Sequence, residues 1–432
     1  MKRYPKYKES GQSWVGQVPA HWELKPNRSL FRDVGQTVEN KGEGVLLLSL
    51  TQNGLIPRDM ENPTGKFPAD FSTYQKVKTG DLVFCLFDVD ETPRTVGISS
   101  HEGMITGAYT VVRCYDESHA KYLYWFYLSL DEAKRLKPLY KGLRKVVPAE
   151  TFRSIKSPIP PRDEAVKICN FIESQVDSMN KAISSQERMI ELLKERRSAI
   201  ITHAVTKGLK PKAKMKDTGV PWLGHVPAHW NIMKLSRIID PLRPITYGIV
   251  QAGEDFLDGV KYIRPVDMTD SAGVKDEASL RTTTPEIALQ YKRSAVKSGD
   301  VVFSIGPSYG KVMIVPASLQ GANLTQGTAR LALVRDASRN FMCYALQSAP
   351  CRAQWDVSVG GATFAGLNLK PLSRTLLAIP PLNEQEEISA YLDRIINVCD
   401  HAIASQEKMI ELLKERRSAV VTQAVTGQID VR

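Results

Sequence analysis

Few residues in this 432-residue chain stand at the spacings that catalysis requires. The segment SIGPSYGKV, residues 304–312, superficially resembles a phosphate-binding loop, but Gly306 and Gly310 are one residue too close and Val312 stands where Ser or Thr should bind magnesium. The segment is more typical of a glycine-containing β-hairpin. No G-x-G-x-x-G motif opens a helix, the seven histidines are dispersed, and no carboxylates pair at credible metal spacing. The sequence therefore predicts no catalytic residue, no bound cofactor and no metal site.

Polar and basic side chains are better placed to contact a nucleic acid. Residues 133–156 contain eight Lys or Arg and a single Glu, a density that suits contacts with phosphates. The whole chain has a formal net charge of +11, which favours an anionic partner. A basic but inert surface would give the same net charge.

Candidate nucleic-acid-contacting residues follow from their positions, because Asn, Gln and Arg can form two hydrogen bonds with the edge of adenine or guanine. In the first half of the chain the candidates are Gln52, Asn53, Lys141, Arg144 and Lys145. In the second half they are Arg264, Tyr309, Lys311 and Thr363. The clustered residues of the first half, from Lys141 to Lys145, are expected to contact mainly phosphates. For each candidate, turn chemistry or an ordinary surface charge is the alternative.

The elements that carry these residues occur twice in the chain. Residues 182–206 recur as residues 402–426 with 20 of 25 positions identical. The other repeated pairs are SWVGQVPAHW and PWLGHVPAHW (13–22 and 221–230), KTGDLVF and KSGDVVF (78–84 and 297–303), and SPIPPRDEAVKICNFI and LAIPPLNEQEEISAYL (157–172 and 377–392). The constant order of these segments indicates two copies of one unit with small insertions. His21 and His229 occupy the same place in the twin P-A-H-W motif, which indicates a structural role.

Each copy ends in a long predicted helix, because apolar residues recur at steps of mostly three and four. Asp163 is the predicted N-cap of the first helix, and Gly208 and Gly427 mark the expected C-terminal stops. At 1.5 Å per residue, a helix of about 42 residues is about 60 Å long, and no single globular core encloses it. The two helices are therefore predicted to pack on each other, antiparallel if the two copies are equivalent.

The contact seam of this helix pair follows a heptad pattern. Its central residues are Gln186, Ile190, Leu193 and Arg197 in the first helix and Gln406, Ile410, Leu413 and Arg417 in the second. The Gln and Arg positions are expected to fix the register at some cost in stability.

The segments before the helices have the alternation of short strands and helices expected of mixed α/β domains. The sequence divides into a globular segment (1–157), a long helix (158–208), a second globular segment (209–377) and a second long helix (378–432). The predicted fold class is α+β, with the two mixed α/β segments at opposite ends of a long antiparallel two-helix coiled coil and a pseudo-two-fold internal repeat.

The remaining features point to a reduced, cytoplasmic setting. The N-terminal residues lack the apolar region of a signal peptide, and the apolar stretches are too short to span a membrane. None of the six cysteines forms a C-x-x-C motif.

The ordered duplication of W-x-G-x-V-P-x-H-W, G-D-x-V-F, and I-P-P followed by a long charged helix resembles the specificity (S) subunit of Type I restriction-modification systems. The resemblance covers essentially the whole chain. It implies that each globular segment is a target recognition domain for one half of a split, asymmetric site in double-stranded DNA. It also implies that the helices set the gap between the half-sites and dock two modification (methyltransferase) subunits, which methylate adenine.

Restriction (translocase-nuclease) subunits would join that assembly. The chain would then be no enzyme, and S-adenosylmethionine, ATP and Mg would belong to the partner subunits. The alternative is a coiled-coil interaction scaffold without sequence-specific DNA binding. A scaffold gives no reason for the globular halves to diverge while the helices stay nearly identical.

Overall fold

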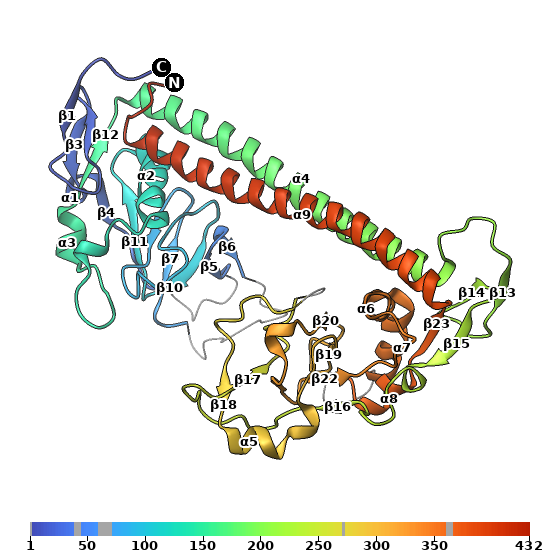
Figure 1. The fold of residues 1–432 in the computed structure, drawn as a ribbon. Coiled ribbons are helices and arrows are strands. Elements are labelled where there is room, and N and C mark those ends of the chain that lie inside the picture. Colours follow the sequence, from blue (N-terminus) through green and yellow to red (C-terminus); the bar gives the residue numbers. More distant parts are fainter. Residues whose placement is uncertain (1, 39–44, 59–70, 270–272, 360–365) are drawn as a thin grey trace. The chain divides into compact units, whose positions relative to one another are not determined.

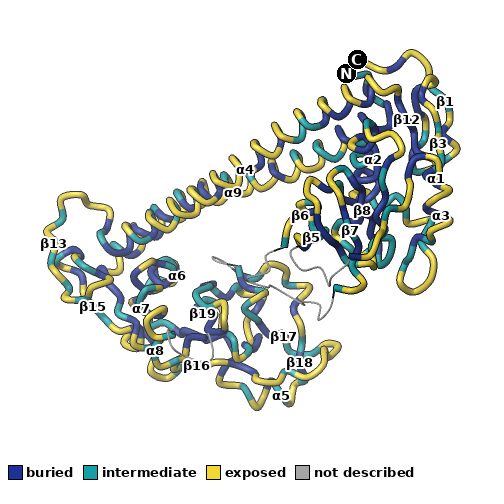
Figure 2. The backbone as a smooth tube through the Cα atoms, turned by 180° about the vertical axis from the view of Figure 1, so that it is seen from behind, coloured by how far each residue is buried: buried dark blue, intermediate teal, exposed yellow. Residues whose placement is uncertain are grey.

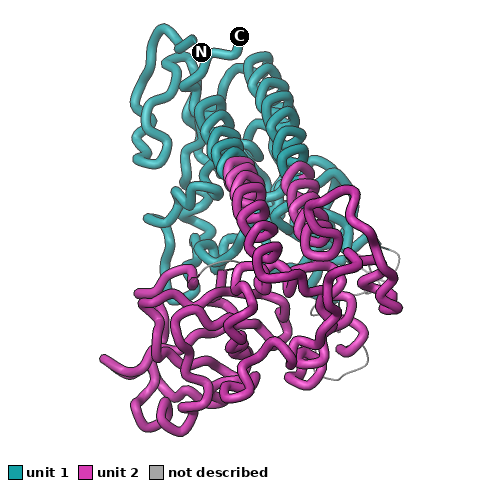
Figure 3. Tube along the Cα trace, turned by 45° about the vertical axis from the view of Figure 1, so that its right-hand side comes forward, with its two compact units in different colours: residues 1–187, 408–432 teal, residues 188–407 magenta. Residues whose placement is uncertain are grey.

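The protein is described by a computed structural model that covers residues 2–38, 45–58, 71–269, 273–359 and 366–432. It divides into two compact units (Figure 3). Unit 1 comprises Met1–Glu187 and Lys408–Arg432, and unit 2 comprises Arg188–Glu407. Each unit thus contains part of both long helices. The four segments proposed from the sequence divide the chain at the helix ends instead, and they stay a prediction.

Unit 1 combines short strands with helices of very different length (Figure 1). Its strands are β1 (Tyr7–Glu9), β2 (Gln17–Pro19), β3 (Glu23–Pro26), β4 (Phe31–Asp33), β5 (Leu48–Thr51), β6 (Gly54–Pro57), β7 (Tyr74–Val77), β8 (Leu82–Phe84), β9 (Val96–Ile98), β10 (Gly103–Thr106), β11 (Thr110–Cys114) and β12 (Lys156–Ile159). Its short helices are α1 (Asn27–Leu30), α2 (Ala120–Glu132) and α3 (Ala149–Ser154).

Unit 2 repeats this mixture. Its strands are β13 (Met215–Asp217), β14 (His225–Pro227), β15 (Asn231–Lys234), β16 (Thr246–Tyr247), β17 (Val260–Ile263), β18 (Thr282–Thr283), β19 (Val301–Ser304), β20 (Val312–Ile314), β21 (Asn323–Leu324), β22 (Thr328–Leu331) and β23 (Leu376–Ile379). Its short helices are α5 (Pro285–Gln290), α6 (Arg339–Gln347), α7 (Ala349–Val359) and α8 (Leu369–Arg374). The mixed α/β composition expected of both globular segments is confirmed.

The central sheets of the two units have the same topology. Four antiparallel strands lie in the order β4-β11-β8-β9 in unit 1 and β16-β22-β19-β20 in unit 2. Leu82 lies opposite Val112 in the first sheet, and Val301 lies opposite Leu331 in the second. Because β8 and β19 belong to the repeated G-D-x-V-F segments, the internal repeat of the sequence is also a repeat of the fold.

The Asp of this repeated segment has the same structural role in both units. Asp81 and Asp300 are buried, and each accepts a hydrogen bond from the backbone N–H three residues earlier, at 2.8 and 2.7 Å. Arg113 binds the Asp81 carboxylate with two nitrogens at 2.6 and 2.9 Å, and Arg243 binds Asp300 at 2.8 and 2.6 Å. A buried carboxylate needs such partners to offset its desolvation, so the motif is structural.

In each unit, one antiparallel pair of strands, here called the neck, brings the two ends of the globular part together. In unit 1, β3 pairs with β12, with Pro26 opposite Lys156. In unit 2, β15 pairs with β23, with Lys234 opposite Leu376. The chain between these strands, residues 27–155 and 235–375, is therefore an insertion that leaves and returns at adjacent points.

The long helices are α4 (Arg162–Lys207) and α9 (Leu382–Val425), and buried residues recur along both (Figure 2). In unit 1, Arg417 donates to Asn180 at 2.7 Å; in unit 2, Arg197 donates to Asp400 at 3.0 Å. The earlier residue of α4 thus pairs with the later residue of α9, and the later residue of α4 with the earlier residue of α9. The antiparallel pairing predicted from the sequence is therefore confirmed within each unit. The two contacts join equivalent positions of the repeat.

The ends of α4 and α9 can be compared with the predicted caps. Gly208 and Gly427 follow α4 and α9 with φ of 74° and 70°, the left-handed conformation that terminates helices. Asp163 was expected as the N-cap, and this is wrong, because α4 begins at Arg162. The carbonyl of Pro161 accepts the first helical bond from Ala165 at 2.9 Å, so Asp163 lies inside the first turn, where its charge still favours the positive helix end.

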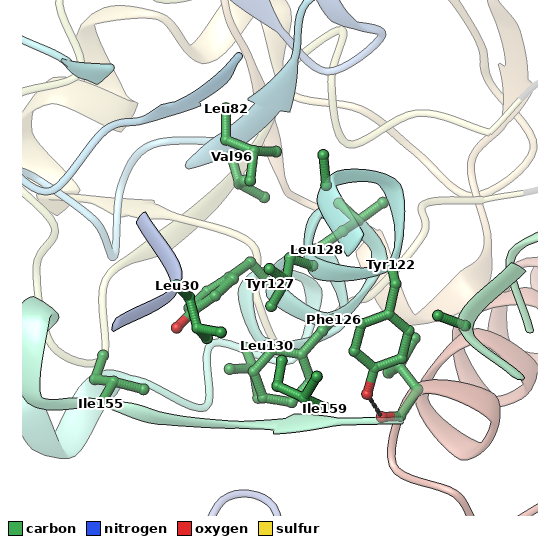
Figure 4. Packing of buried hydrophobic residues seen from close by; sticks show 14 of the residues in the cluster. Leu30, Leu82, Val96, Tyr122, Phe126, Tyr127, Leu128, Leu130, Ile155 and Ile159 are labelled. Atoms are coloured by element: carbon green, nitrogen blue, oxygen red, sulfur yellow. Dashed lines mark hydrogen bonds between the residues drawn. The ribbon is translucent and has the colours of Figure 1, made fainter. Parts of the chain in front are cut away.

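The core of each unit joins the globular part to the helices. In unit 1, the aromatic side chains of α2 pack in one core with Ile159 of β12, and Tyr122 donates to the carbonyl of Val425 in α9 at 2.8 Å (Figure 4). In unit 2, Trp355 packs edge-on against Phe303, in a core that includes Val205 of α4. The helices are therefore part of both cores and not a separate appendage.

The twin P-A-H-W motif packs at these junctions, as its repetition predicted. Trp22 and Trp230 are fully buried. His21 lies 2.8 Å from Glu164 at the start of α4, and His229 lies 2.7 Å from Glu384 at the start of α9. Both histidines thus hold a strand-helix junction together.

Replacement of Glu164 by Gln should destabilise unit 1. Burial raises the pKa of Glu164, but hydrogen bonds from Tyr4, His21 and Trp22 outweigh it and hold the pKa below its ordinary 4.5. A Gln side chain has a single acceptor oxygen for these donors, so we expect a loss of about 1–3 kcal/mol in the free energy of unfolding at pH 7.

The same substitution should change the pH dependence of stability. Because the folded pKa is depressed, the contribution of Glu164 is present above pH 4.5 and disappears as the pH falls through the folded value. Urea titrations at pH 7 and in the acid range should therefore show a shallower acid decline for Glu164→Gln. The exposed Glu187 on the same helix provides the control, since Glu187→Gln removes a charge without a buried hydrogen bond. An unchanged acid decline in Glu164→Gln would contradict the assignment.

Candidate nucleic-acid interface

The basic loop, residues 141–146, is a tight turn with ordered side chains. Lys141 and Val146 exchange two backbone hydrogen bonds of 2.8 and 2.9 Å across its base. Arg144 donates to Asp88 at 2.8 Å, and Lys145 donates to Asp90 at 2.9 Å. Hydrogen bonds from Lys145 and Lys137 lower the pKa of Asp90 to about 2. Asp88 and Asp90, in the loop after β8, therefore form ion pairs with two of the three candidates. The third candidate, Lys141, is exposed and has no such ion pair among the described contacts.

Backbone strain accompanies these contacts. Asp88 and Lys145 adopt φ of 47° and 44°, a region that residues other than glycine rarely occupy. The backbone N–H of Asp88 donates to the carbonyl of Arg144 at 2.8 Å, so the two loops are joined through main chain and side chain alike. Strained conformations persist only where surrounding contacts enforce them, and they are enriched at functional sites.

Gln52 and Asn53 form the turn of the β5–β6 hairpin and are exposed. The carbonyl of Gln52 accepts a hydrogen bond from Arg94 at 2.7 Å, and the N–H of Asn53 donates to Thr51 at 3.2 Å. Both residues line a cavity of about 490 Å³ whose wall includes Arg417 of α9. Their side chains are thus available to a ligand on one side of the hairpin, beside the helices of unit 1.

In unit 2, the segment 304–312 is the glycine-containing hairpin predicted from the sequence, because β19 and β20 pair antiparallel on either side of it. The hydroxyl of Tyr309 donates to Asp356 at 2.5 Å. The ammonium group of Lys311 lies 3.4 Å from the carbonyl of Pro265. Both candidates therefore lie on one structured hairpin.

The other two candidates of unit 2 are Arg264 and Thr363. Arg264 follows β17, and its guanidinium binds Asp267 with two nitrogens at 2.9 and 2.7 Å. That ion pair occupies the Nε and Nη2 atoms of the guanidinium, so Arg264 also stabilises the turn after β17. Its contact with DNA stays a prediction. Thr363 lies outside the described residues.

The predicted seam residues lie along the paired faces of α4 and α9. Ile190 and Ile410 are buried, and the other six, namely Gln186, Leu193, Arg197, Gln406, Leu413 and Arg417, are partly buried. A partly buried polar residue in such a seam favours one register because a shifted register would leave it unpaired.

Sequence reasoning missed Arg352, Phe87 and Asp88. Arg352 stands on α7 and its guanidinium lies over the ring of Tyr309. Phe87 and Asp88 contact Arg144 from the loop after β8. No local pattern marks these residues, since each partner lies 43 to 57 residues away along the chain.

Within the described ranges, no three His, Cys, Asp or Glu side chains gather in a way that could hold a metal ion. In the same part of the chain, no helix is long and apolar enough to cross a membrane.

The chain thus belongs to the class of internally duplicated α+β proteins in which each unit contains part of two long antiparallel helices. Comparisons with known proteins narrow this class. Residues 251–412 match the family model described as the Type I restriction modification DNA specificity domain. The specificity subunit of the Type I restriction enzyme EcoBI from Escherichia coli is 27% identical over 290 residues, which cover 66% of this chain and 60% of that protein. The putative MjaX specificity subunit from Methanocaldococcus jannaschii is 21% identical over 99% of this chain and 98% of its own length.

Two solved structures share the fold. A structure that describes complex assembly and conformational transition of a type I R-M system has a TM-score of 0.71 at 15% identity, covering 95% of this chain and 99% of that one. The HsdS subunit from Thermoanaerobacter tengcongensis has a TM-score of 0.50 at 15% identity, covering 95% and 98%. Residues 251–412 thus match the DNA specificity domain of Type I restriction-modification systems, and the chain is similar over most of its length to specificity subunits of Type I restriction enzymes.

Proposed function

We propose that this chain is the non-catalytic subunit that gives a Type I restriction-modification complex its DNA sequence specificity. Each unit recognises one half of a split, asymmetric site in double-stranded DNA. Two modification subunits methylate adenine at that site, and restriction subunits join the complex. S-adenosylmethionine, ATP and Mg are bound by those partner subunits and not by this chain.

The observation that carries this proposal is one scaffold with two different surfaces. Both units have the same sheet order and the same neck, so they share a framework. The family match lies chiefly in unit 2, and the common framework extends its role to unit 1. The loops differ, since the basic loop 141–146 of unit 1 has no charged counterpart in the nearly uncharged residues 355–370. Divergent loops on a common framework suit recognition of two different sequences.

The outer faces of the helices support docking of two partner subunits. Met189 and Leu192 on α4 are 47% and 44% exposed, and their repeats Met409 and Leu412 on α9 are each 47% exposed. Apolar side chains three residues apart form one stripe on a helix, and water-exposed stripes of this kind are typical of surfaces that a partner covers. Because the stripe occurs once on each helix, it fits two copies of one partner.

Reconstitution tests this function. The purified chain alone should methylate no DNA, and with its modification subunits it should methylate adenine in a split site. Leu192→Asp together with Leu412→Asp should prevent co-purification of the modification subunits, because a charge would be buried in an apolar contact. The matched control is Lys194→Asp with Lys414→Asp, which places the same charge at exposed polar positions of the same helices.

The scaffold alternative makes a different prediction. A scaffold would still bind its partners, but all DNA sequences would compete equally for the complex. Equal competition by random DNA, or base methylation by the chain alone, would overturn the proposed function.

A further inference from the structure

A repeated feature of the two units concerns the loop that follows the G-D-x-V-F strand. In unit 1 the guanidinium carbon of Arg144 lies 5.4 Å from the ring centroid of Phe87. In unit 2 the guanidinium carbon of Arg352 lies 5.4 Å from the ring centroid of Tyr309. The rings lie in equivalent connections, β8 to β9 and β19 to β20, but the arginines come from dissimilar segments. The same arrangement is therefore built twice from different residues.

In unit 1 two contacts hold the Arg144 side chain, which is 70% exposed, and a hydrogen bond fixes its backbone. Asp88 accepts from its Nη2 at 2.8 Å, and the backbone N–H of Asp88 donates to the Arg144 carbonyl. Phe87 is itself fixed, since its ring stacks on Tyr109 with centroids 5.9 Å apart and an interplanar angle of 17°. An exposed arginine normally samples many rotamers, so this one is held in place before any ligand arrives.

In unit 2 other contacts give the same result. Nη1 of Arg352 lies 3.4 Å from the carbonyl oxygen of Tyr309, and the Tyr309 hydroxyl is anchored on Asp356, one turn further along α7. Gly310 has φ of 105°, and a Cβ at this position would come within 2.8 Å of Nη1 of Arg352. Glycine at this position leaves the space that the guanidinium occupies.

An arginine stacked on a ring keeps the N–H groups at its edge available to a ligand. The planar fork of these groups matches the O6 and N7 acceptors of guanine in the major groove. Prior stacking reduces the conformational entropy lost on binding, so the hydrogen bonds contribute more to affinity. Phosphate contacts need no such arrangement, because they depend mainly on charge.

The charges around the loop distinguish the two kinds of contact in unit 1. Asp88 neutralises Arg144 locally, which weakens its attraction to a phosphate but leaves the geometry of its fork intact. Lys141 in the same loop is exposed, and among the contacts of the described residues no carboxylate or ring holds its ammonium group. Lys141 thus fits a phosphate, and Arg144 fits a base edge.

We propose that Arg144 and Arg352 are specificity-determining residues, each of which binds a guanine edge in one half of the recognised site. Phe87 and Tyr309 are positioning residues that act through these arginines. The proposal rests on the proposed function and adds to it the residues that read the sequence.

Selection of bound sequences from a random DNA library, with the full-length chain in its modification complex, tests the proposal. The wild-type complex defines the site first. Arg144→Lys keeps the charge and loses the fork, so preference for guanine should fall roughly 5- to 150-fold at one position of one half-site. Arg352→Lys should have the same effect in the other half. Lys141→Gln is the matched control and should weaken binding to all sequences alike while reducing the salt slope by about one unit.

The positioning residues have their own test. Tyr309→Leu should loosen the guanine preference of the second half-site, whereas Tyr309→Phe keeps the ring and should retain most of it. Thermal unfolding of each variant shows whether it is folded. An unchanged base preference in the other half-site shows that the rest of the complex still binds DNA normally. If Arg144→Lys and Arg352→Lys leave every base preference unchanged, the proposal is overturned while the proposed function stands. If the wild-type complex selects no sequence, the proposed function fails, and the proposal fails with it.

Discussion

Exchange of residues 27–155 for the matching segment of a relative should replace one half of the recognised DNA sequence and leave the other half unchanged. The structure defines these boundaries, because β3 and β12 pair immediately outside them and bring the two ends of the segment together. The neck and the helices, which hold the partner subunits in the proposed function, would stay native. The change should be complete for that half, since every recognition loop of unit 1 is exchanged.

The graft must keep its contacts with the helices. Tyr122 packs against Trp22 with ring centroids 6.1 Å apart and donates to the carbonyl of Val425, so the donor segment needs a tyrosine at that position. Genome-wide mapping of methylated adenines gives the readout, and exchange of residues 235–375 between β15 and β23 gives the matched experiment for unit 2. A swap of 27–155 that alters both halves of the site would refute one-half recognition by unit 1.

Much of this fold could be predicted because its signals are local or repeated. The helix pair follows from apolar residues at steps of three and four, and its antiparallel direction follows from equivalence of the two copies. Repetition also separated structural from functional residues, since His21 and His229, and likewise Asp81 and Asp300, proved to hold junctions and turns. A motif that recurs in two divergent domains is required by what they share, which is the framework.

The candidate site was less predictable because its chemistry depends on distant partners. The sequence shows that residues 133–156 are basic, but Asp88 and Asp90 neutralise part of that charge from another loop. Arg264 is different, because its partner Asp267 is near in sequence, and their ion pair depends on the turn between them. The sequence gives no indication that Arg352 is part of the site. Its position depends on the ring of Tyr309, over which it lies, and on the absence of a side chain at Gly310.

Removal of one heptad from each long helix should shorten the gap between the two half-sites without changing their sequences. The Arg197–Asp400 contact sets the register, which makes residues 190–196 of α4 face residues 401–407 of α9. Deletion of both segments joins Met189 to Arg197 and Asp400 to Lys408, so the contact and the seam stay in phase. Seven residues are about 10 Å of helix, which corresponds to about three base pairs at about 3.4 Å each.

Binding to a set of DNAs whose gap varies by single base pairs gives the measurement. We expect affinity for the native gap to fall and the preferred gap to become shorter, because the recognition loops stay unchanged while the two paired helices lose length. Deletion of residues 190–196 alone is the control: it removes Ile190 and Leu193 from the seam without removing their partners on α9, so it should destabilise unit 2 and lower the thermal midpoint. A paired deletion that folds and still prefers the original gap would show that α4 and α9 do not set the spacing between the half-sites.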